Sequence, residues 1–253
     1  MIIAEGLTDI GRARSQNQDA FFISTVPVGP LPNLFLVADG MGGHNAGDVA
    51  STKAAAFFCD YVKNYSQREG VSQMDLLVEA ASDANRRVLE IAESDPSLAG
   101  MGTTLTACTA LDNGKCEFIH VGDSRAYMVN DGKITQITLD HTFVGEMVKA
   151  GQLTPEQART HPKRNILTRV LGGVSPILLA DGFVREIPLG GYVLLCSDGL
   201  TSELDDEAIK GVVLSKRGLR EKARTLVKLA NESGGADNIT VVLIRHMEKR
   251  NVE

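Results

Sequence analysis

Aspartates that end apolar runs are the residues of this chain whose type and spacing could do chemistry. Asp39 follows the apolar residues 34–38, and Asp198 follows residues 192–197. A glycine comes directly after each of these aspartates. A buried strand that delivers a carboxylate to its own end, beside flexible backbone, presents a metal ligand or an acid. The two runs therefore predict two carboxylates that converge at one edge of a core.

The pair Asp-Gly is also a common turn signal, and four such pairs occur in this chain. The pair that begins at Asp131 lies between two alternating runs, which predicts a β-hairpin turn. The pair that begins at Asp181 has similar surroundings, and we expect a turn there as well. Asp198 differs, because an apolar run leads into it as residues 34–38 lead into Asp39, and these two aspartates are the candidate functional residues.

Three more aspartates, Asp19, Asp123 and Asp237, border apolar segments, where an unpaired charge would be costly to desolvate. The five histidines are scattered and the four cysteines are not clustered. A set of oxygen ligands alone suits Mg²⁺ or Mn²⁺ and argues against zinc. Two such ions, about 4 Å apart, can share a bridging water and make it a nucleophile for a phosphate ester.

The composition excludes several classes of protein. The 253 residues are 43% hydrophobic and 23% charged, which is ample for one buried core. The net charge of −6 comes with no basic stripe, which argues against a nucleic-acid surface. No signal-peptide pattern is found, and no apolar run approaches the ~20 residues that a bilayer span needs. The cysteines lack a Cys-x-x-Cys pair, so we expect buried free thiols and a cytoplasmic location.

The apolar periodicity predicts paired strands that alternate with paired helices. Strands are expected at residues 2–8, 20–26, 34–38, 103–111, 115–121, 125–130, 133–137, 177–187, 191–197 and 238–245. Helices are expected at residues 46–64, 74–94, 205–214 and 219–232, and a small helical flap insertion at residues 141–173. Neighbouring strands favour antiparallel sheets over a parallel βαβ sheet. We predict a single α+β domain over residues 1–253, with two antiparallel β-sheets packed face to face and helices on both outer faces.

Motifs of other phosphate-binding proteins and hydrolases do not fit this sequence. Gly42 and Gly47 have the spacing of a P-loop, but Asp48 and Val49 follow where that loop needs lysine and serine or threonine. A dinucleotide fingerprint would need glycine at Asn45, which instead is a good N-cap for the helix that follows. A Gly-x-Ser-x-Gly nucleophile elbow does not occur.

Seven short motifs follow one another along the chain. They are Arg14-x-x-Asn17-x-Asp19, Val37-Ala38-Asp39-Gly40-Met41-Gly42-Gly43-His44, Gly102-Thr103-Thr104, Val121-Gly122-Asp123-Ser124-Arg125-Ala126-Tyr127, Leu167-Thr168-Arg169-Val170-Leu171-Gly172, Cys196-Ser197-Asp198-Gly199-Leu200 and Asp237-Asn238-Ile239-Thr240-Val241. Any one of them is weak evidence, but their order over nearly the whole chain is specific. In this order they resemble the metal-dependent serine/threonine phosphatases of the 2C type, and the compact bacterial branch in particular.

The resemblance implies a β-sandwich with a dinuclear Mg²⁺ or Mn²⁺ site at one end. Asp39 would bridge the two ions, and the backbone carbonyl of Gly40 would bind one of them. Asp198 and Asp237 would hold the other ion.

The same resemblance implies roles for further residues. Asp19 would act mainly through bound water, and Asp123 with Asp198 would make a third, weaker metal position. Arg14 would bind the substrate phosphate, for which its planar guanidinium is suited. Residues 141–173 would be the variable flap beside the site.

Two positions depart from the eukaryotic pattern of this family. Gln18 stands where a glutamate often precedes the aspartate, and Met41 stands where a histidine is proposed as general acid. His44 lies three residues further on, in a glycine-rich loop. We expect Asp123 and a metal-held water, and not His44, to protonate the leaving group. His120, on an apolar strand, is expected to be a core residue and not a ligand.

The resemblance implies an enzyme that hydrolyses phosphoserine and phosphothreonine in proteins with a water that bridges two Mg²⁺ or Mn²⁺ ions. The expected partners are phosphorylated proteins and a bacterial serine/threonine kinase whose action the enzyme reverses. We expect a monomer, with neither nucleic acid nor membrane as a partner. Two alternatives stay open. A catalytically silent relative that serves as a binding module would have lost a metal aspartate, and all of them are present here. A two-metal nucleotide phosphatase fits the same charges.

Overall fold

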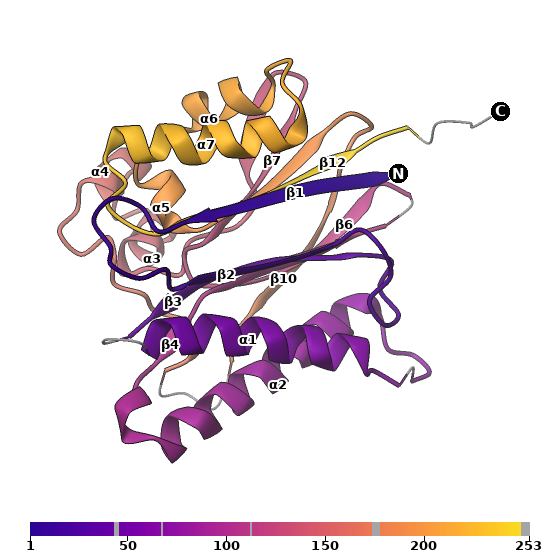
Figure 1. Cartoon of the computed structure of the whole chain (residues 1–253), viewed down its shortest axis with the longest axis vertical. Helices are drawn as coiled ribbons and strands as arrows, with labels where there is room; N and C mark the ends of the chain where they lie inside the picture. The colour runs from indigo at the N-terminus through magenta and orange to yellow at the C-terminus, as the bar shows by residue number, and fades with distance from the viewer. Residues whose placement is uncertain (43–45, 67, 112, 174–177, 249–253) are drawn as a thin grey trace.

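Two antiparallel β-sheets lie face to face in the computed structural model (Figure 1), which describes residues 1–42, 46–66, 68–111, 113–173 and 178–248. Within these residues, the first sheet has the strand order β1 (Ile2–Asp9), β12 (Ile239–His246), β11 (Tyr192–Cys196), β7 (Arg125–Asn130) and β8 (Lys133–Gln136). The second sheet has the order β10 (Asp181–Glu186), β6 (Lys115–Val121), β5 (Leu105–Ala110), β3 (Leu34–Met41), β4 (Gly102–Thr103) and β9 (Leu171–Gly172). In this second sheet β2 (Asp19–Ser24) also pairs with β3.

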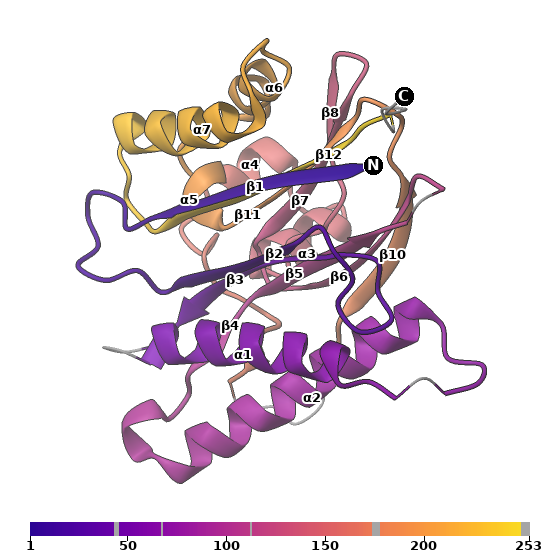
Figure 2. The same ribbon diagram turned by 45° about the vertical axis from the view of Figure 1, so that its right-hand side comes forward.

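Helices cover the outer face of each sheet (Figures 1 and 2). The second sheet is covered by α1 (Ala46–Lys63) and α2 (Gln73–Ser94), which the short helix η1 (Pro96–Leu98) follows. The first sheet is covered by α5 (Asp198–Thr201), α6 (Asp206–Val213) and α7 (Leu219–Ser233). The insertion carries α3 (Phe143–Lys149) and α4 (Pro155–Arg159). The predicted α+β sandwich with helices on both outer faces is confirmed.

The alternation of side chains along β3 explains its continuous apolar run. Leu34, Leu36 and Ala38 pack in the cluster beneath α1 and α2. Phe35 and Val37 instead pack against side chains of the first sheet. Successive side chains of a strand point to opposite faces, and both faces of β3 are buried. Full burial of each large apolar side chain stabilises the fold by about 1.5–3 kcal/mol. The backbone of β3 near Asp39 is therefore held firmly in place.

One face of α1 is buried against this strand. Ala50, Ala54, Phe58 and Val62 lie four residues apart and are fully buried. Side chains at this spacing share one face of a helix. The predicted N-cap, Asn45, lies outside the described residues.

The end of β3 differs from the prediction. The strand continues to Met41, so Asp39 lies within it and not after it. It continues because Asp39 still pairs with Asp19 of β2, and Gly40 pairs with Thr103 of β4. Two neighbouring strands thus fix the backbone on both sides of the Asp39 carboxylate.

The two turn predictions have opposite outcomes. Asp131 and the glycine after it have φ values of +47° and +74°, the left-handed conformation of a two-residue hairpin turn between β7 and β8. That prediction is confirmed. Asp181 and Gly182 instead begin β10, where Asp181 pairs with His120, so the second turn prediction is wrong. A Cβ on Gly182 would lie 2.7 Å from the sulfur of Met74, so the glycine serves close packing of α2 on the strand.

Other boundaries also shift. The strand predicted at residues 103–111 is broken at Thr104, because β4 turns to pair with β9. The flap insertion predicted at residues 141–173 therefore ends in the sheet, in β9. The strand predicted at residues 177–187 begins only at β10, and residue 177 lies outside the described residues.

Two further expectations concern the burial of the cysteines and the presence of a membrane-spanning helix. Cys108, Cys116 and Cys196 are buried free thiols as predicted, whereas Cys59 is only half-buried. In the part of the chain that the structure describes, no helix is both long and apolar enough to cross a membrane.

Candidate metal centre

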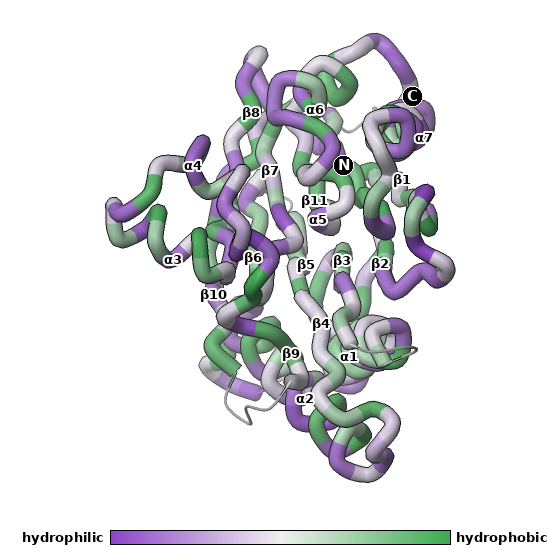
Figure 3. Tube along the Cα trace, turned by 90° about the vertical axis from the view of Figure 1, so that its left-hand side faces the viewer, coloured by the Kyte–Doolittle hydropathy of each residue, from purple (hydrophilic) through white to green (hydrophobic). Residues whose placement is uncertain are grey.

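Asp19 and Asp39 face each other across the β2–β3 pair at one end of the sandwich. Figure 3 views this end, with the flap helices α3 and α4 to one side of β3 and β11. The Asp39 amide donates to the Thr104 hydroxyl over 2.9 Å, and the Asp39 carbonyl accepts from the Thr104 amide over 2.9 Å. Both backbone groups of Asp39 are therefore fixed by the break between β4 and β5.

The Asp19 carboxylate has one satisfied oxygen and one unsatisfied oxygen. Its Oδ2 accepts from Ser197 Oγ over 2.7 Å and from Thr240 Oγ1 over 2.6 Å. Its Oδ1 is buried and has no hydrogen-bond partner among the residues that the structure describes. A buried oxygen of this kind requires a partner such as a cation or an ordered water.

Asp198 and Asp237 come from the first sheet. Asp198 opens α5 directly after Ser197, which follows β11, and its carboxyl is hydrogen-bonded to that of Asp39. Asp237 lies in the turn between α7 and β12, where its Oδ2 accepts from Arg14 Nη2 over 2.6 Å. The two sheets therefore each contribute carboxylates to the same end of the molecule.

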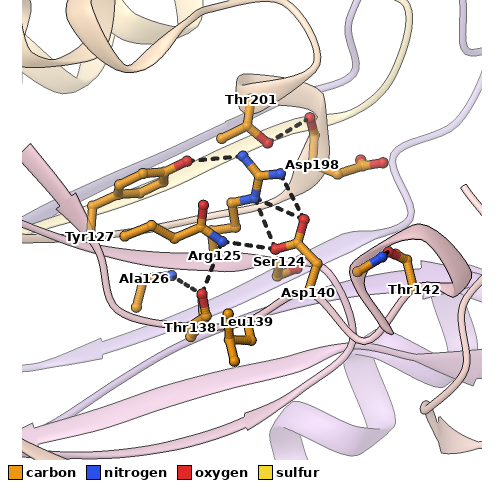
Figure 4. A network of polar contacts seen from close by, with 12 residues as sticks. Ser124, Arg125, Ala126, Tyr127, Thr138, Leu139, Asp140, Thr142, Asp198 and Thr201 are labelled. Carbon is orange, nitrogen blue, oxygen red and sulfur yellow. Dashed lines mark hydrogen bonds and ion pairs between the residues drawn. The ribbon is translucent and has the colours of Figure 1, made fainter. Parts of the chain in front are cut away.

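Asp123 lies in the turn between β6 and β7. The neighbouring Ser124 hydroxyl is 2.7 Å from Thr104 Oγ1, so the threonine that fixes Asp39 also contacts this turn. Arg125 follows and makes an ion pair with Asp140 over 2.6 Å (Figure 4).

Burial and mutual repulsion raise the pKa of these carboxyls. Desolvation, with smaller contributions from Asp198 and Asp237, raises the pKa of Asp19 to about 7. Desolvation and the charges of Asp198 and Asp140 raise the pKa of Asp123 to about 8. The pKa of Asp39 and that of Asp198 are also raised, again mainly by burial and then by neighbouring aspartates. These groups cannot all be ionised at neutral pH unless a cation compensates them.

The donor set fits divalent cations that prefer oxygen. The candidates are carboxylates, one of which has an orphaned buried oxygen, together with a backbone carbonyl at Gly40. A Cβ on Gly40 would lie 2.0 Å from the carbonyl oxygen of Gly47, so the chain passes too closely there for any side chain. Among the described residues, no three acidic, histidine or cysteine side chains are already arranged around an ion. A cation between these carboxylates would offset their mutual repulsion and draw them closer together.

Residues 11–243 match the family described as Protein phosphatase 2C. The chain belongs to the protein phosphatase 2C family. It is 41% identical over 249 residues to a putative protein phosphatase 2C-type of Streptococcus pyogenes serotype M6, covering 97% of this chain and 98% of that one. The structure of the serine/threonine phosphatase of S. agalactiae is similar, with a TM-score of 0.89, 37% identity, and coverage of 98% of this chain and 100% of the other.

A third relative was solved with metal. The catalytic domain of the serine/threonine protein phosphatase PstP, in complex with two manganese ions, has a TM-score of 0.83 and 34% identity. The match covers 98% of this chain and 99% of that one. These phosphatases of the 2C family thus share the sandwich of this chain over nearly its full length.

In this protein phosphatase 2C chain, the predicted aspartates come together from separate segments. The pKa values of Asp19, Asp39, Asp123 and Asp198 each respond to the charges of others in the set. Asp237 contributes to the raised pKa of Asp19, Asp39 and Asp198, so it lies close as well. Arg14 reaches the group through Asp237, with half of its side chain exposed. His44 lies outside the described residues.

His120 is the core residue that was expected. It is fully buried, with Nδ1 2.9 Å from Thr106 Oγ1 and Nε2 3.1 Å from the carbonyl oxygen of Leu139. Burial and the neighbouring His141 lower its pKa to about 4, so it is neutral at physiological pH.

Sequence reasoning missed the residues that orient the candidate ligands. Ser197 and Thr240 fix one oxygen of Asp19, and Thr104 fixes Asp39. All three are fully or almost fully buried polar residues in apolar surroundings. Their polar type within or directly beside apolar strands was the available signal, but it did not reveal which aspartate each one binds.

Proposed function

We propose that this chain is a metal-dependent serine/threonine protein phosphatase, which hydrolyses phosphoserine and phosphothreonine in proteins. The observation that best supports this is the group of aspartates at one end of the sandwich, whose pKa values are raised by burial and by one another. Buried acids of this kind need a compensating cation. The names of the relatives and the manganese ions of PstP support the same function.

In this proposal, Asp39, Asp198, Asp237 and the Gly40 carbonyl hold two Mn²⁺ or Mg²⁺ ions. When bound, the ions supply positive charge for the phosphate and lower the pKa of a water near them toward neutrality. Asp39 lies on β3 and Asp198 and Asp237 at the end of the first sheet, so the site spans both layers. Asp19 offers its free Oδ1 to a bound water while Ser197 and Thr240 hold its other oxygen.

Arg14 and Asp123 act on the substrate side. The Arg14 guanidinium is half exposed and has donors to spare beyond its contact with Asp237, so it can bind the oxygens of a phosphate. Asp123, whose pKa is about 8, can carry a proton near neutral pH. With Asp198 it would hold a third and weaker ion, beside the leaving oxygen.

The finer features of the proposal concern partners and organisation. The substrates are phosphorylated proteins, and a serine/threonine kinase supplies them in a signalling pair in the cytoplasm. The chain acts as a monomer with one domain over residues 1–253, and residues 141–173 are its flap. The presence of every candidate metal aspartate disfavours a silent binding module.

The test of this function uses protein stripped of metal with EDTA and then restored with Mn²⁺. Phosphate release is measured side by side on a phosphoserine peptide, a phosphothreonine peptide, a phosphotyrosine peptide and ATP. We expect Mn²⁺-dependent release from the first two and little from the others. Full activity after chelation would contradict metal dependence, and a preference for ATP would favour a nucleotide phosphatase.

The same assay is applied to Asp39→Asn, with Asp131→Asn as the matched control. Asp39 lies on the buried strand β3 and would hold both ions, whereas Asp131 lies in an exposed hairpin turn whose left-handed backbone asparagine tolerates. We expect Asp39→Asn to lose turnover roughly 10³-fold, about 4 kcal/mol of transition-state stabilisation. Asp131→Asn should keep it. An Asp39→Asn protein within threefold of the wild type would refute the bridging role.

A further inference from the structure

Asp140, directly before the flap, and His141, the first residue of the flap, hold both sides of the turn that carries Asp123; we call these two residues the flap base. The Asp140 carboxylate accepts from Arg125 Nε over 2.9 Å and from Arg125 Nη2 over 2.6 Å (Figure 4). The His141 amide donates to the Gly122 carbonyl over 2.8 Å, and the Gly122 amide donates to His141 Nδ1 over 3.1 Å. Asp123 lies between the two anchored positions, so its backbone has little freedom.

Gly122 cannot shift away from its contacts with His141, which we call the His141 clamp. Its φ is +104°, and a Cβ at this position would lie 2.5 Å from Thr104 Cγ2. Its amide is buried and needs an acceptor, which the His141 ring provides. His141 itself is 2% exposed, so water does not replace this contact.

The other side of His141 holds the return of the flap. Because Nδ1 accepts a hydrogen bond, the neutral ring carries its proton on Nε2, which donates to Asp181 Oδ2 over 3.2 Å. The Thr168 amide donates to the His141 carbonyl over 2.8 Å. Arg169 Nη1 donates to Asp181 Oδ1 over 3.0 Å. The outgoing and returning chains of the flap therefore meet at one buried histidine.

We propose that Asp140 and His141 are positioning residues for Asp123, so that the base of the flap sets where this carboxylate lies. The proposal rests on the proposed function, because it assigns Asp123 to the leaving group. In this proposal, the flap base affects protonation of the leaving group because it holds the turn of residues 122–125, which carries Asp123. We expect the flap base to leave unchanged the affinity for the two ions that Asp39, Asp198 and Asp237 would hold.

The experiment compares variants on opposite sides of the same imidazole. His141→Gln removes the acceptor of the Gly122 amide, because the longer amide side chain places its polar group near the position of Nε2. Asp181→Ala removes the partner of Nε2 and leaves the Gly122 contact intact. Asp140→Asn keeps the shape of the side chain that binds Arg125 and removes its charge. This variant replaces His141→Gln in the test if His141→Gln does not fold.

Three readouts separate positioning from folding. They are kcat and KM for a phosphothreonine peptide and for an aryl phosphate, calorimetric Mn²⁺ titration of stripped protein, and hydrogen exchange of the Gly122 amide. We expect His141→Gln to lower kcat on the peptide about tenfold and on the activated aryl phosphate less than threefold, as for weakened acid assistance. KM and the affinity for the first two ions should stay unchanged, and the Gly122 amide should exchange faster. Asp140→Asn should show the same selective loss, and Asp181→Ala should not.

Two results would overturn the proposal. One is an equal loss on both substrates in His141→Gln and Asp140→Asn, and the other is a selective loss in Asp181→Ala as large as in His141→Gln. If the wild type releases no phosphate, the proposed function fails. Hydrogen exchange of the Gly122 amide then tests by itself whether His141 holds the turn. Unchanged protection of the Gly122 amide in His141→Gln would refute the His141 clamp.

Discussion

Asp237 and Arg14 show how a single contact can join metal binding to substrate binding. The carboxylate and the guanidinium are 2.6 Å apart, and Asp237 is also a candidate metal ligand. A cation at Asp237 would weaken the hold of this carboxylate on Arg14, since the carboxylate has only its two oxygens to share. Arg14 would then be free to turn toward a phosphate at the moment when the metals are in place.

Arg14→Ala should therefore weaken substrate binding more than metal binding. We expect the KM for a phosphopeptide to rise about tenfold, at the low end for a charge-assisted contact because half of the side chain is exposed. The affinity for Mn²⁺ should not fall, since the substitution removes a cation that competes for Asp237. Steady-state kinetics and calorimetry measure the two effects. Arg12→Ala, in the same loop and also exposed, is the control. A fall in metal affinity with an unchanged KM would make Arg14 a structural residue.

A second prediction concerns the general acid. Asp123→Ala should retain tight binding of two ions yet lose about 100-fold in turnover of a phosphopeptide, because an alkoxide leaves poorly without a proton. The loss should be milder on an activated aryl phosphate. His44→Ala should cost far less on either substrate. The reverse ranking, with His44→Ala the crippling change on phosphopeptides, would identify His44 as the acid.

At the scale of elements, the flap has a base and an outer face with different tasks. The base binds the turn that carries Asp123, as described above. On the outer face, Phe143 and Ile166 are exposed large apolar residues whose backbones are joined by a hydrogen bond of 2.8 Å. Lys163 Nζ lies 5.2 Å from the centre of the Phe143 ring. An apolar surface beside a cation suits contact with a peptide more than contact with a small phosphate ester.

The corresponding prediction is that Ile166→Ser lowers kcat/KM for a phosphopeptide about threefold to tenfold and spares a small aryl phosphate. Val184→Ser, at a similarly exposed apolar position on β10, should change neither substrate. Parallel kinetics on the two substrates is the measurement. Equal losses on both would mean that the outer face supports the metal site itself and does not select substrates.

At the scale of the whole molecule, the buried carboxyls make stability depend on pH and on metal. The folded-state pKa is about 7 for Asp19 and about 8 for Asp123, far above the ordinary value of 3.8. Between these values the folded chain binds more protons than the unfolded chain, so the free energy of unfolding falls as pH rises. His120, whose pKa is lowered to about 4, acts in the opposite direction only below about pH 6.5.

We therefore predict that the Tm of stripped protein falls from pH 6.5 to pH 8.5. Mn²⁺ at a hundredfold excess over its Kd should add about 2.7 kcal/mol of stability and reverse the fall. Asp123→Asn should flatten the slope for the stripped protein, because it removes one of the titrating groups. Thermal melts at fixed ionic strength measure both effects. A Tm that rises over this range without metal would mean that the carboxyls are paired and not mutually repelling.

The sequence by itself determined the layered fold and the candidate ligands. Continuous apolar runs such as the one before Asp39 report burial on both faces, and burial of a strand is a local property of its residue types. An aspartate beside such a run is conspicuous because its charge conflicts with its neighbours. His120 was correctly assigned to the core because the strand around it is apolar.

Only the tertiary structure decided how these residues are held and joined. Ser197 and Thr240 bind Asp19 across 178 and 221 positions of sequence, and such contacts depend on strand register and sheet packing, which local patterns do not encode. The Asp-Gly pair at Asp181 lies in a strand because it pairs with β6, a segment far away in the chain, and Gly182 leaves room for Met74 of α2. The clamp of His141 on Gly122 arises in the same way, from an insertion that folds back onto a turn. Residue types therefore predicted the candidate groups for chemistry, and three-dimensional packing decided their partners.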